Sequence, residues 1–475
     1  MFVNKIKVID AVMGTGKTSY CIQQMKKNAN TGKQYIFVTP YLDEVKRVKD
    51  ACPECDFAEP LPDAWNENKS EAFKDFLADG RNIVTTHNLL RRMDVESLTL
   101  IESKDYTLIM DEVMDVVEPL KLRKNQYLDG VGKEDSASKR EIAEMFARDL
   151  LRRGDPISED GSVCWVDAGT ATLGRYNDIK EYAEGKRLAM VNDMLILWLF
   201  PVSIFKAFSE VWNLCYLFEG QMQKAYYDAF SLEYDYYTVT GKRPEDGGKG
   251  FSLVDYEFGK SYELRQLKMF SKLIDLVESP RWNAVGDPDN HLTFSFFNYD
   301  RRHKRMHSQL SKNLDTFFRD AGGRITDRMW CCYKGPTVQT KKVKGETVKV
   351  GKHEKAIGRP RFRSAFVACN VRATNRFKDR SIVAYCINRK LEPMKVHFFK
   401  ACNVDLDEDL FALSEMVQWI WRSRIRTYDP IRLYVPSRRM RELLKQWLKG
   451  AFTIAANPRQ SSASTTLVEV DRLCA

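Results

Sequence analysis

The sequence has no hydrophobic run long enough to cross a lipid bilayer. Its most apolar stretch, MLILWLFPVSIF at 194–205, is broken by Pro201, whereas a membrane-spanning helix needs about 20 apolar residues. The amino-terminal segment MFVNKIKVID has no long apolar core before Asp10, so it is not of the signal-peptide type. These absences predict a soluble, cytoplasmic protein.

The sequence also lacks the paired cysteine motifs of a zinc ribbon. Cys52 and Cys55 stand in CPEC, which has metal or redox spacing, but no second CxxC lies at the required distance. We interpret this pair as a Pro-containing turn, with a metal or redox site as the alternative. The eleven cysteines are an odd number, and most lie in apolar runs, which is typical of reduced thiols that pack as small hydrophobic side chains.

The composition is that of a globular protein with a mild basic excess. The 475 residues are 44% hydrophobic and 29% charged, so the chain is too long for one ordinary core and we expect two or three domains. Lysine and arginine exceed aspartate and glutamate by 75 to 65, a net charge of +10. This excess favours a polyanionic partner.

Strand-like and helix-like segments alternate in the first 120 residues. The apolar runs of strand length are KIKVIDAV (5–12), QYIFVTP (34–40), RNIVTTHNLL (81–90) and YTLIMDEV (106–113), with helical patterns between them. Such alternation predicts a mainly parallel sheet covered on both faces, in which ligands bind at the carboxyl ends of the strands.

A second set of the same kind follows the Gly-rich segment GKRPEDGGKG at 241–250. We therefore predict an α/β fold with two domains, 1–225 and 226–475. The first domain carries an insertion at about 121–190, with helical stretches such as 139–153, and the second carries a basic loop at 335–363. After the insertion, the sheet pattern of the first domain resumes at 195–200 and 210–218. In the second domain the strand candidates are 291–298, 327–334, 363–370, 381–388 and 431–437, and the helical patterns are 308–321, 413–426 and 438–450.

The segment AVMGTGKT at 11–18 follows the first strand and precedes a helix. It matches the phosphate-binding loop pattern except that Ala11 replaces the first glycine. Two glycines let backbone N–H groups turn toward phosphate oxygens, and the helix start adds its positive dipole end. Lysine reaches the β- and γ-phosphates, and threonine can bind Mg²⁺. The predicted nucleotide-binding residues are Gly14, Thr15, Gly16, Lys17, Thr18 and Ser19, with a Gly-rich turn as the alternative.

Two adjacent carboxylates end the apolar strand TLIM. Asp111 is the candidate for holding Mg²⁺ together with Thr18, and Glu112 the candidate for polarising an attacking water. An Asp-Glu pair after a strand is often only the start of a loop. Behind a phosphate-binding loop, it instead indicates a nucleotide hydrolase that uses ATP and Mg²⁺.

These motifs resemble those of superfamily 2 helicases, and the closest resemblance is to the DEAD-like replication helicases of tailed bacteriophages. The residues that carry it occur in the family order: AVMGTGKT, VTP (38–40), IVTTHNLL (83–90), IMDEV (109–113), ACNVRATN (368–375) and QWIWRSRIR (418–426). The resemblance implies two RecA-like domains with ATP between them and single-stranded nucleic acid across their upper face. If the chain is phage-encoded, it implies a location in the host-cell cytoplasm.

The chain departs from the family pattern in three places. ATNRFKDR at 373–380 lacks the usual Gly-Asp pair, so the resemblance gives Asp379 no clear role. Cys215 occupies the expected polar position of the third motif, which leaves Tyr216 or Gln221 to couple hydrolysis to movement. No adenine-reading motif precedes the phosphate-binding loop.

The stretch QWIWRSRIR packs arginines beside large aromatic residues, and 416–428 contains no acid. On a helix over 413–426, Gln418, Arg422 and Arg426 share one face because they are four residues apart. The resemblance makes Arg422 the arginine finger that reaches the γ-phosphate from the other domain, with Arg426 favoured over Arg424 as a second. A planar guanidinium suits phosphate oxygens, although a solvated helix face is the alternative.

The candidates for nucleic-acid contact lie in loops at strand ends. Hydroxyls, amides and helix starts suit phosphate and sugar contacts, although each of these residues is equally consistent with a helix cap, and His87 with a structural hydrogen bond. The basic loop at 335–363 adds electrostatic affinity or is only a solvated hairpin. The candidates are Thr39, Pro40, Thr85, Thr86, His87, Asn370, Arg372, Thr374 and Asn375.

The favoured hypothesis is an ATP-dependent DNA helicase or translocase of phage replication or recombination. Its expected partners are single-stranded or forked DNA and other replication proteins, without a membrane. An RNA helicase needs the same motor, and a remodelling ATPase that binds nucleic acid without unwinding it is a further alternative. A nuclease motor subunit is disfavoured because no cluster of acids with lysine stands outside the motor motifs.

Overall fold

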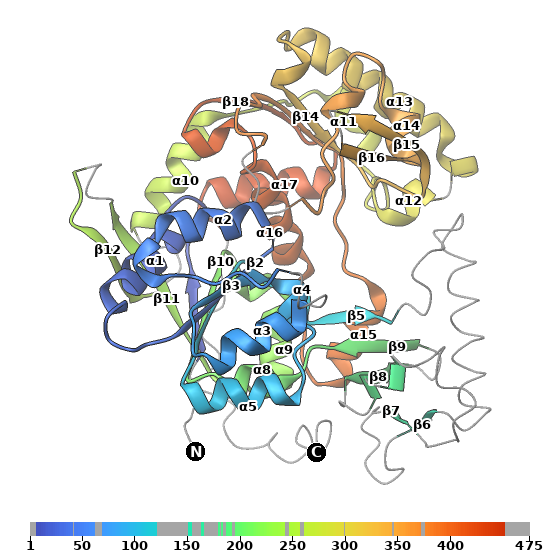
Figure 1. Ribbon diagram of the computed structural model, residues 1–475. Helices are drawn as coiled ribbons and strands as arrows, with labels where there is room; N and C mark the ends of the chain where they lie inside the picture. The colour runs from blue at the N-terminus through green and yellow to red at the C-terminus, as the bar shows by residue number, and fades with distance from the viewer. Residues whose placement is uncertain are drawn as a thin grey trace.

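The computed structural model describes residues 6–40, 42–61, 69–120, 151–153, 163–165, 179–180, 182–183, 187–191, 195–242, 247–256, 261–298, 300–343, 346–371 and 376–451. Two α/β parts lie one above the other in Figure 1, each built around its own sheet. The prediction of an α/β chain with mainly parallel sheets is confirmed.

The first sheet has seven strands in the order β12-β11-β1-β10-β4-β2-β3. All neighbours are parallel except β11 and β12. Because β10 lies between β1 and β4, the carboxyl ends of these three strands meet at one edge. The strand bounds are β1 Ile6–Asp10, β2 Tyr35–Thr39, β3 Ile83–Thr86, β4 Thr107–Asp111, β10 Glu210–Cys215, β11 Tyr234–Lys242 and β12 Gly250–Asp255.

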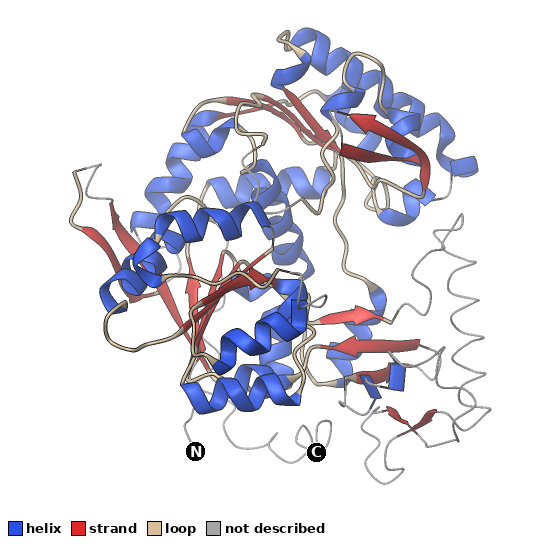
Figure 2. Cartoon of the chain, viewed as in Figure 1, coloured by secondary structure: helices blue, strands red, loops and turns tan. Residues whose placement is uncertain are grey.

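Helices cover both faces of this sheet (Figure 2). Alternate strand residues point to opposite faces, so Val8 packs in one apolar cluster and Ile9 in the other. Both side chains are fully buried, which explains why the strands read as continuous apolar runs. The helices of this part are α1 Lys17–Asn28, α2 Leu42–Ala51, α3 Lys69–Ala78, α4 His87–Leu90, α5 Val95–Lys104, α8 Val202–Ala207 and α9 Met222–Ala229.

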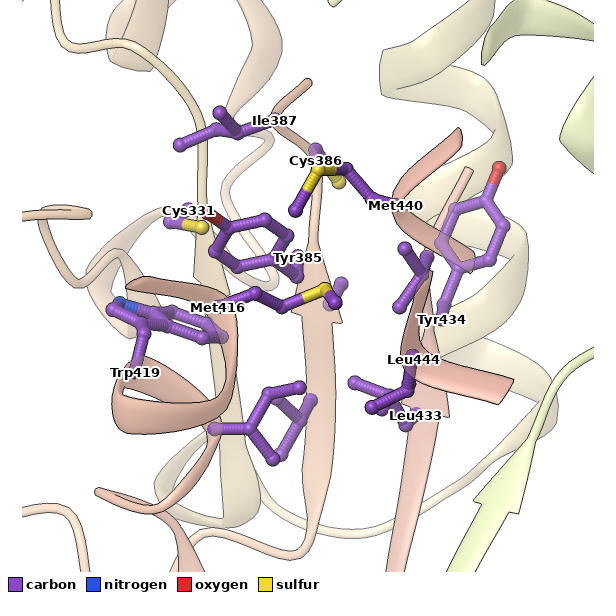
Figure 3. Close-up of a cluster of buried hydrophobic side chains, with 14 of the residues drawn as sticks. Cys331, Tyr385, Cys386, Ile387, Met416, Trp419, Leu433, Tyr434, Met440 and Leu444 are labelled. Carbon is purple, nitrogen blue, oxygen red and sulfur yellow. The ribbon is translucent and has the colours of Figure 1, made fainter. Parts of the chain in front are cut away.

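The second sheet has four parallel strands in the order β13-β18-β17-β14. In its core, Tyr385 of β17 and Leu433 of β18 lie beside Trp419 and Leu444, and Cys331 of β14 belongs to the same cluster (Figure 3). The bounds are β13 Ile274–Leu276, β14 Arg328–Cys331, β17 Ile382–Tyr385, β18 Ile431–Tyr434, α10 Ser261–Leu273, α11 Pro280–Asn283, α12 Phe294–Asn298, α13 Asp300–Asp320, α16 Glu408–Ile420 and α17 Arg438–Leu448.

Two strand predictions in this part are wrong. Segment 291–298 contains helix α12, and the Thr293 hydroxyl accepts a hydrogen bond from the Phe296 backbone N–H at 3.3 Å, as a helix-start residue does. Segment 363–370 pairs with β14 through a single bridge between Phe366 and Trp330. Both runs are short and apolar, and such runs do not distinguish a strand from a buried turn or helix.

A separate antiparallel sheet stands beside the first one. It has the order β5-β9-β8, from Val117–Pro119, Leu195–Leu199 and Leu188–Val191. The prediction that 195–200 resumes the main sheet is therefore wrong, because this run forms β9 of the small sheet. The prediction for 210–218 is confirmed, since this run contains β10 of the main sheet. Most of the predicted helix at 139–153 lies outside the described residues, and its end, Leu151–Arg153, is strand β6, which pairs with β7 at Val163–Trp165.

The basic segment at 335–363 is folded rather than a loop. Strands β15 (Thr337–Val343) and β16 (Glu346–Gly351) form an antiparallel hairpin that leads into helix α14 (Lys352–Ile357). His353 and Ile357 on α14 are buried, because they pack on the second part of the chain. The hairpin is thus anchored at its base.

The chain crosses between the two parts more than once. Strands β11 and β12 lie beyond residue 225 yet complete the first sheet, and the Gly-rich segment at 241–250 falls in their hairpin. We therefore propose that the first domain ends after β12 and the second begins with α10. Helix α15 (Pro393–Ala401) returns to the first part, where Phe398 and Phe399 join its core beside the small sheet (Figure 1).

Among the described residues, no helix has the length and apolar character needed to cross a membrane.

Candidate functional site

The loop between β1 and α1 has the backbone of a phosphate-binding turn. Gly14 and Gly16 have φ of 82° and 95°, a left-handed conformation that glycine adopts without steric cost. Neither position has room for a side chain: a Cβ at Gly14 would lie 2.6 Å from Cζ2 of Trp421, and one at Gly16 would lie 2.2 Å from Cε1 of Phe251. Helix α1 starts at Lys17, so its positive dipole end faces the loop.

Lys17 lies inside this loop. Its ammonium donates to the backbone carbonyl oxygens of Ala11 at 2.5 Å and Val12 at 3.4 Å. Burial lowers the pKa of Lys17, while the nearby carboxylates Asp10, Asp111 and Glu112 act in the opposite direction. Thr15 turns back onto the loop, where its hydroxyl donates to the carbonyl of Val12 at 2.8 Å.

Thr18 and Asp111 meet across the edge of the sheet. The Thr18 hydroxyl donates to Asp111 Oδ1 at 3.2 Å, because the ends of β1 and β4 lie on either side of β10. Burial raises the pKa of Asp111 to about 6, and the neighbouring Glu112 adds to the rise. A hydroxyl from the first turn of α1 and a carboxylate at the end of β4 fit the oxygen ligands that Mg²⁺ prefers.

Glu112 forms an ion pair with Arg422 of the second part. Arg422 Nη2 lies 2.9 Å from Glu112 Oε1, and the Arg422 side chain is only 7% exposed. Glu112 has a left-handed φ of 72°, and its N–H donates to the carbonyl of Leu214 at 3.0 Å. Left-handed residues other than glycine often mark functional positions, and here the strained turn directs the carboxylate toward the second part.

The helix predicted over 413–426 ends earlier than expected. Helix α16 stops at Ile420, whose carbonyl accepts both the N–H and the hydroxyl of Ser423, and a short 3-10 turn follows at Arg424–Thr427. The single helical face inferred for Gln418, Arg422 and Arg426 is therefore wrong, because the Arg424 N–H, which would continue the helix, donates to the carbonyl of Arg380 at 2.9 Å instead.

All three of these side chains nevertheless line the same pocket. Burial lowers the pKa of Arg426, and the nearby Arg422 contributes to the decrease. Arg424 lies outside the pocket, since its guanidinium is 3.7 Å from Asp429. The structure thus places Arg426, rather than Arg424, beside Arg422.

The pocket lies between the two parts, and seven of its sixteen lining residues are charged. Two of its charged residues, Glu44 and Arg47 on α2, were not predicted from the sequence. Arg47 Nε lies 2.5 Å from Glu44 Oε2, and Arg47 Nη2 lies 3.9 Å from Asp111 Oδ2. Glu44 and Arg47 are three residues apart, a spacing that is common for ion pairs on surface helices. The sequence therefore did not mark them as residues of a binding site. The lining residues are Met13, Gly14, Lys17, Thr18, Glu44, Arg47, Asp111, Glu112, Val113, Leu214, Cys215, Tyr216, Gln418, Trp421, Arg422 and Arg426.

These residues fit a magnesium nucleotide. Lys17, Arg422 and Arg426 supply cations for phosphate oxygens, and Thr18 with Asp111 supplies oxygen ligands for the metal. The Nε of Arg422 is buried and has no hydrogen-bond partner among the described residues. Ser19, in the first turn of α1, is partly buried and is not among the pocket-lining residues.

The segment after β10 connects the phosphate-binding loop to the second part. The carboxylate of Asp10 accepts the N–H groups of Leu217 and Phe218 at 3.0 and 2.8 Å. Asp10 is fully buried, and burial raises its pKa to about 6.

Tyr216 and Gln221, the two coupling candidates, both bond across the interface. The Tyr216 hydroxyl accepts a hydrogen bond from Trp447 Nε1 at 2.8 Å and donates to Glu263 at 3.2 Å. Gln221 Nε2 donates to the Ser414 hydroxyl at 2.8 Å on α16, the helix that precedes Arg422. Hydrogen bonds therefore connect the segment beside Asp10 directly to α16, through Ser414, and to α17, through Trp447.

The candidates for nucleic-acid contact fall into two groups. In the first part, Thr39 and Thr86 are paired neighbours at the ends of β2 and β3, on the same edge as the phosphate-binding loop. Thr39 and Thr85 are buried, while Pro40, Thr86 and His87 are partly exposed. His87 starts α4 and Thr86 precedes it without a side-chain cap. Asn370 is exposed in the second part, and Arg372, Thr374 and Asn375 lie outside the described residues.

Sequence comparisons identify the family. A family model described as the YonV C-terminal Rossmann-like domain matches residues 268–448. The chain is 31% identical over 457 residues to the SPbeta prophage-derived uncharacterized protein YonV of Bacillus subtilis (strain 168), and the alignment covers 94% of this chain and 100% of the relative. The chain belongs to the YonV family.

Two solved structures are distantly similar. One is described as an XPD helicase, with a TM-score of 0.40 and 9% identity, covering 93% of this chain and 94% of the other. The second is Xpd4 of S. tokodaii, with a TM-score of 0.37, 9% identity and the same coverage. Both scores are low, so these likenesses establish neither a shared fold nor a function.

Proposed function

We propose that this protein is an ATP-dependent helicase or translocase that acts on DNA. The observation that carries the proposal is the ion pair between Arg422 and Glu112 at 2.9 Å, inside a pocket that also holds Lys17 and Asp111. A phosphate-binding loop, a metal-type carboxylate, a second acid and a buried arginine from the other part form the set that phosphoryl transfer requires.

Each of these residues has a definite task in this proposal. Lys17 and the N–H groups of the loop bind the β- and γ-phosphates. Thr18 and Asp111 would hold Mg²⁺, which would supply positive charge against the phosphates. Glu112 orients the attacking water and accepts its proton. Arg422 supplies positive charge to the phosphate oxygens when the two parts close.

The ion pair between Arg422 and Glu112 explains how ATP binding acts on both parts. While Arg422 is bound to Glu112, the acid is not available to orient water. The γ-phosphate competes for the guanidinium, so binding of ATP exchanges a carboxylate partner for a phosphate partner and releases Glu112. The polar contacts of Tyr216 and Gln221 with the second part carry the resulting movement to α16 and α17.

Two observations support nucleic acid as the polymer. The candidate contact residues Thr39 and Thr86 lie on the same sheet edge as the phosphate-binding loop, and the chain carries a net charge of +10. DNA replication or recombination is the proposed setting because the YonV relative is prophage-derived.

The test is to measure the ATPase rate of the full chain with single-stranded DNA, duplex DNA and RNA in parallel, followed by strand displacement on a forked duplex. Lys17→Ala serves as the control for contaminating ATPases. Stimulation by single-stranded DNA together with strand displacement supports the proposal. Stimulation by RNA alone indicates an RNA helicase, and stimulation without displacement indicates a remodelling ATPase.

A further inference from the structure

An exposed aromatic ring stands near the pocket. Tyr428 follows the turn at Arg424–Thr427, and it is 44% exposed. Its φ is 60°, a left-handed conformation that is uncommon for a bulky residue. The Tyr428 N–H donates to the carbonyl of Ile425 at 2.9 Å, so the turn holds the backbone in this conformation.

The ring of Tyr428 is held in place by two other aromatic rings, and we call its flat surface the shelf. It stacks on Phe270 with the ring planes 9° apart and the centroids 6.4 Å apart, and it meets Trp421 edge-on at 6.2 Å. Trp421 lines the pocket, and the Tyr428 hydroxyl lies 3.3 Å from where a Cβ at Gly14 would stand. The shelf therefore extends the pocket wall outward from the phosphate-binding loop.

The pocket itself suits phosphates and metal but not a nucleobase. Its polar side chains are charged except for Thr18, Tyr216 and Gln418, and a base placed among them would separate those charges from the phosphates. The base of a bound nucleotide must then lie at the rim. Every base presents a π-face, and stacking on an aromatic ring does not depend on the pattern of its edge.

We propose that Tyr428 stacks on the nucleobase and that the substrate class is nucleoside triphosphates in general rather than ATP alone. This inference rests on the proposed function, because it uses the same phosphate site. It assigns a ligand contact to a residue outside the predicted motifs, and it accounts for the missing adenine-reading motif.

The test is calorimetric titration of the full chain, without magnesium, with ATP, GTP, CTP, UTP and inorganic tripolyphosphate. The four nucleotides should bind wild type within a few-fold of one another. Tyr428→Ala should weaken all four by roughly tenfold and leave tripolyphosphate binding unchanged. Tyr428→Phe should bind like wild type. Phe294→Ala, which removes an exposed ring on α12, is the matched control and should change nothing.

The outcomes separate the two proposals. If wild type binds neither tripolyphosphate nor any nucleotide, the phosphate site and the proposed function are both wrong. If wild type binds all five and Tyr428→Ala binds the nucleotides equally well, only the stacking proposal is contradicted. A parallel loss of tripolyphosphate binding in Tyr428→Ala would make the ring structural, and a strong preference of wild type for one base would contradict the general substrate class.

Discussion

The Arg422 guanidinium lies 2.9 Å from the Glu112 carboxylate, although 310 residues separate them in the chain. Both groups lie in the pocket that contains the phosphate-binding loop. An ion pair this well buried needs a precise geometry to offset the loss of hydration. It ties the two parts of the chain together at the point where we propose that ATP is hydrolysed.

Glu112→Gln should bind ATP at least as tightly as wild type, because a carboxylate no longer competes with the γ-phosphate for Arg422, and it should hydrolyse ATP very slowly. The amide keeps the shape of the side chain but cannot accept a proton from water. The measurement pairs equilibrium ATP binding with the single-turnover rate. Asp115→Asn removes a nearby exposed carboxylate as a control and should keep the wild-type rate. Wild-type turnover in Glu112→Gln would show that another group activates the water.

Asp10 should make stability depend on pH between about 4 and 6. Its pKa is raised to about 6 in the folded protein, above the value of about 3.9 expected in the unfolded chain. The folded state therefore binds the proton more tightly. The stabilisation that this gives is complete below pH 4 and is lost as the pH rises through 6.

Asp10→Asn should remove that contribution. Urea unfolding at pH 4, 5, 6 and 7 gives the free energy of unfolding, and the drop from pH 4 to pH 6 should be smaller in the variant than in wild type. Asn at this position also loses one backbone hydrogen bond, so the variant should be less stable at every pH. Equal pH slopes in the two proteins would contradict the raised pKa of Asp10.

The basic hairpin should contribute to nucleic-acid affinity without contributing to hydrolysis chemistry. Replacing Lys341, Lys342 and Lys349 with Gln should flatten the plot of log K against log salt by up to about 0.7 for each lost phosphate contact with single strands. Deleting 335–363 is a poorer test, because it also removes the buried His353 and Ile357. An unchanged slope would indicate that the hairpin is only a solvated surface.

Local sequence patterns were sufficient to predict the phosphate-binding loop and the acidic pair of the site. The phosphate-binding loop needs Gly14 and Gly16 for their left-handed backbone, and that requirement is visible in eight consecutive residues. Asp111 ends a strand of five residues, and Glu112 follows it directly. Because parallel strands end at one edge, their approach to Thr18 follows from alternation of strands and helices alone. The roles of these residues in hydrolysis stay predictions.

Long-range geometry was not predictable in the same way. The bond between Tyr216 and Trp447 joins residues 231 apart, and no local pattern specifies such a contact. Helix periodicity placed Gln418, Arg422 and Arg426 on one helical face, but the helix ends at Ile420, where the Arg424 N–H turns to the carbonyl of Arg380.

Short apolar runs were the other source of error. The strand prediction at 291–298 failed because period and hydrophobicity do not separate a short helix from a strand. The division at residue 225 failed to anticipate that β11 and β12 pair with β1. Strand order is a tertiary property, and the Gly-rich turn that suggested a boundary is instead a hairpin.

The most direct test of the account is the single-turnover rate of ATP hydrolysis by Arg422→Ala, measured together with its melting temperature. The account predicts a rate lower by about 10³–10⁵, a much smaller change in ATP affinity, and little rescue by Arg422→Lys, since an ammonium lacks the planar fork. Trp421→Ala should instead destabilise the fold by about 3–5 kcal/mol, because Trp421 is only 8% exposed. If Arg422→Ala melts early but hydrolyses ATP at the wild-type rate per folded molecule, Arg422 is structural and the account is contradicted.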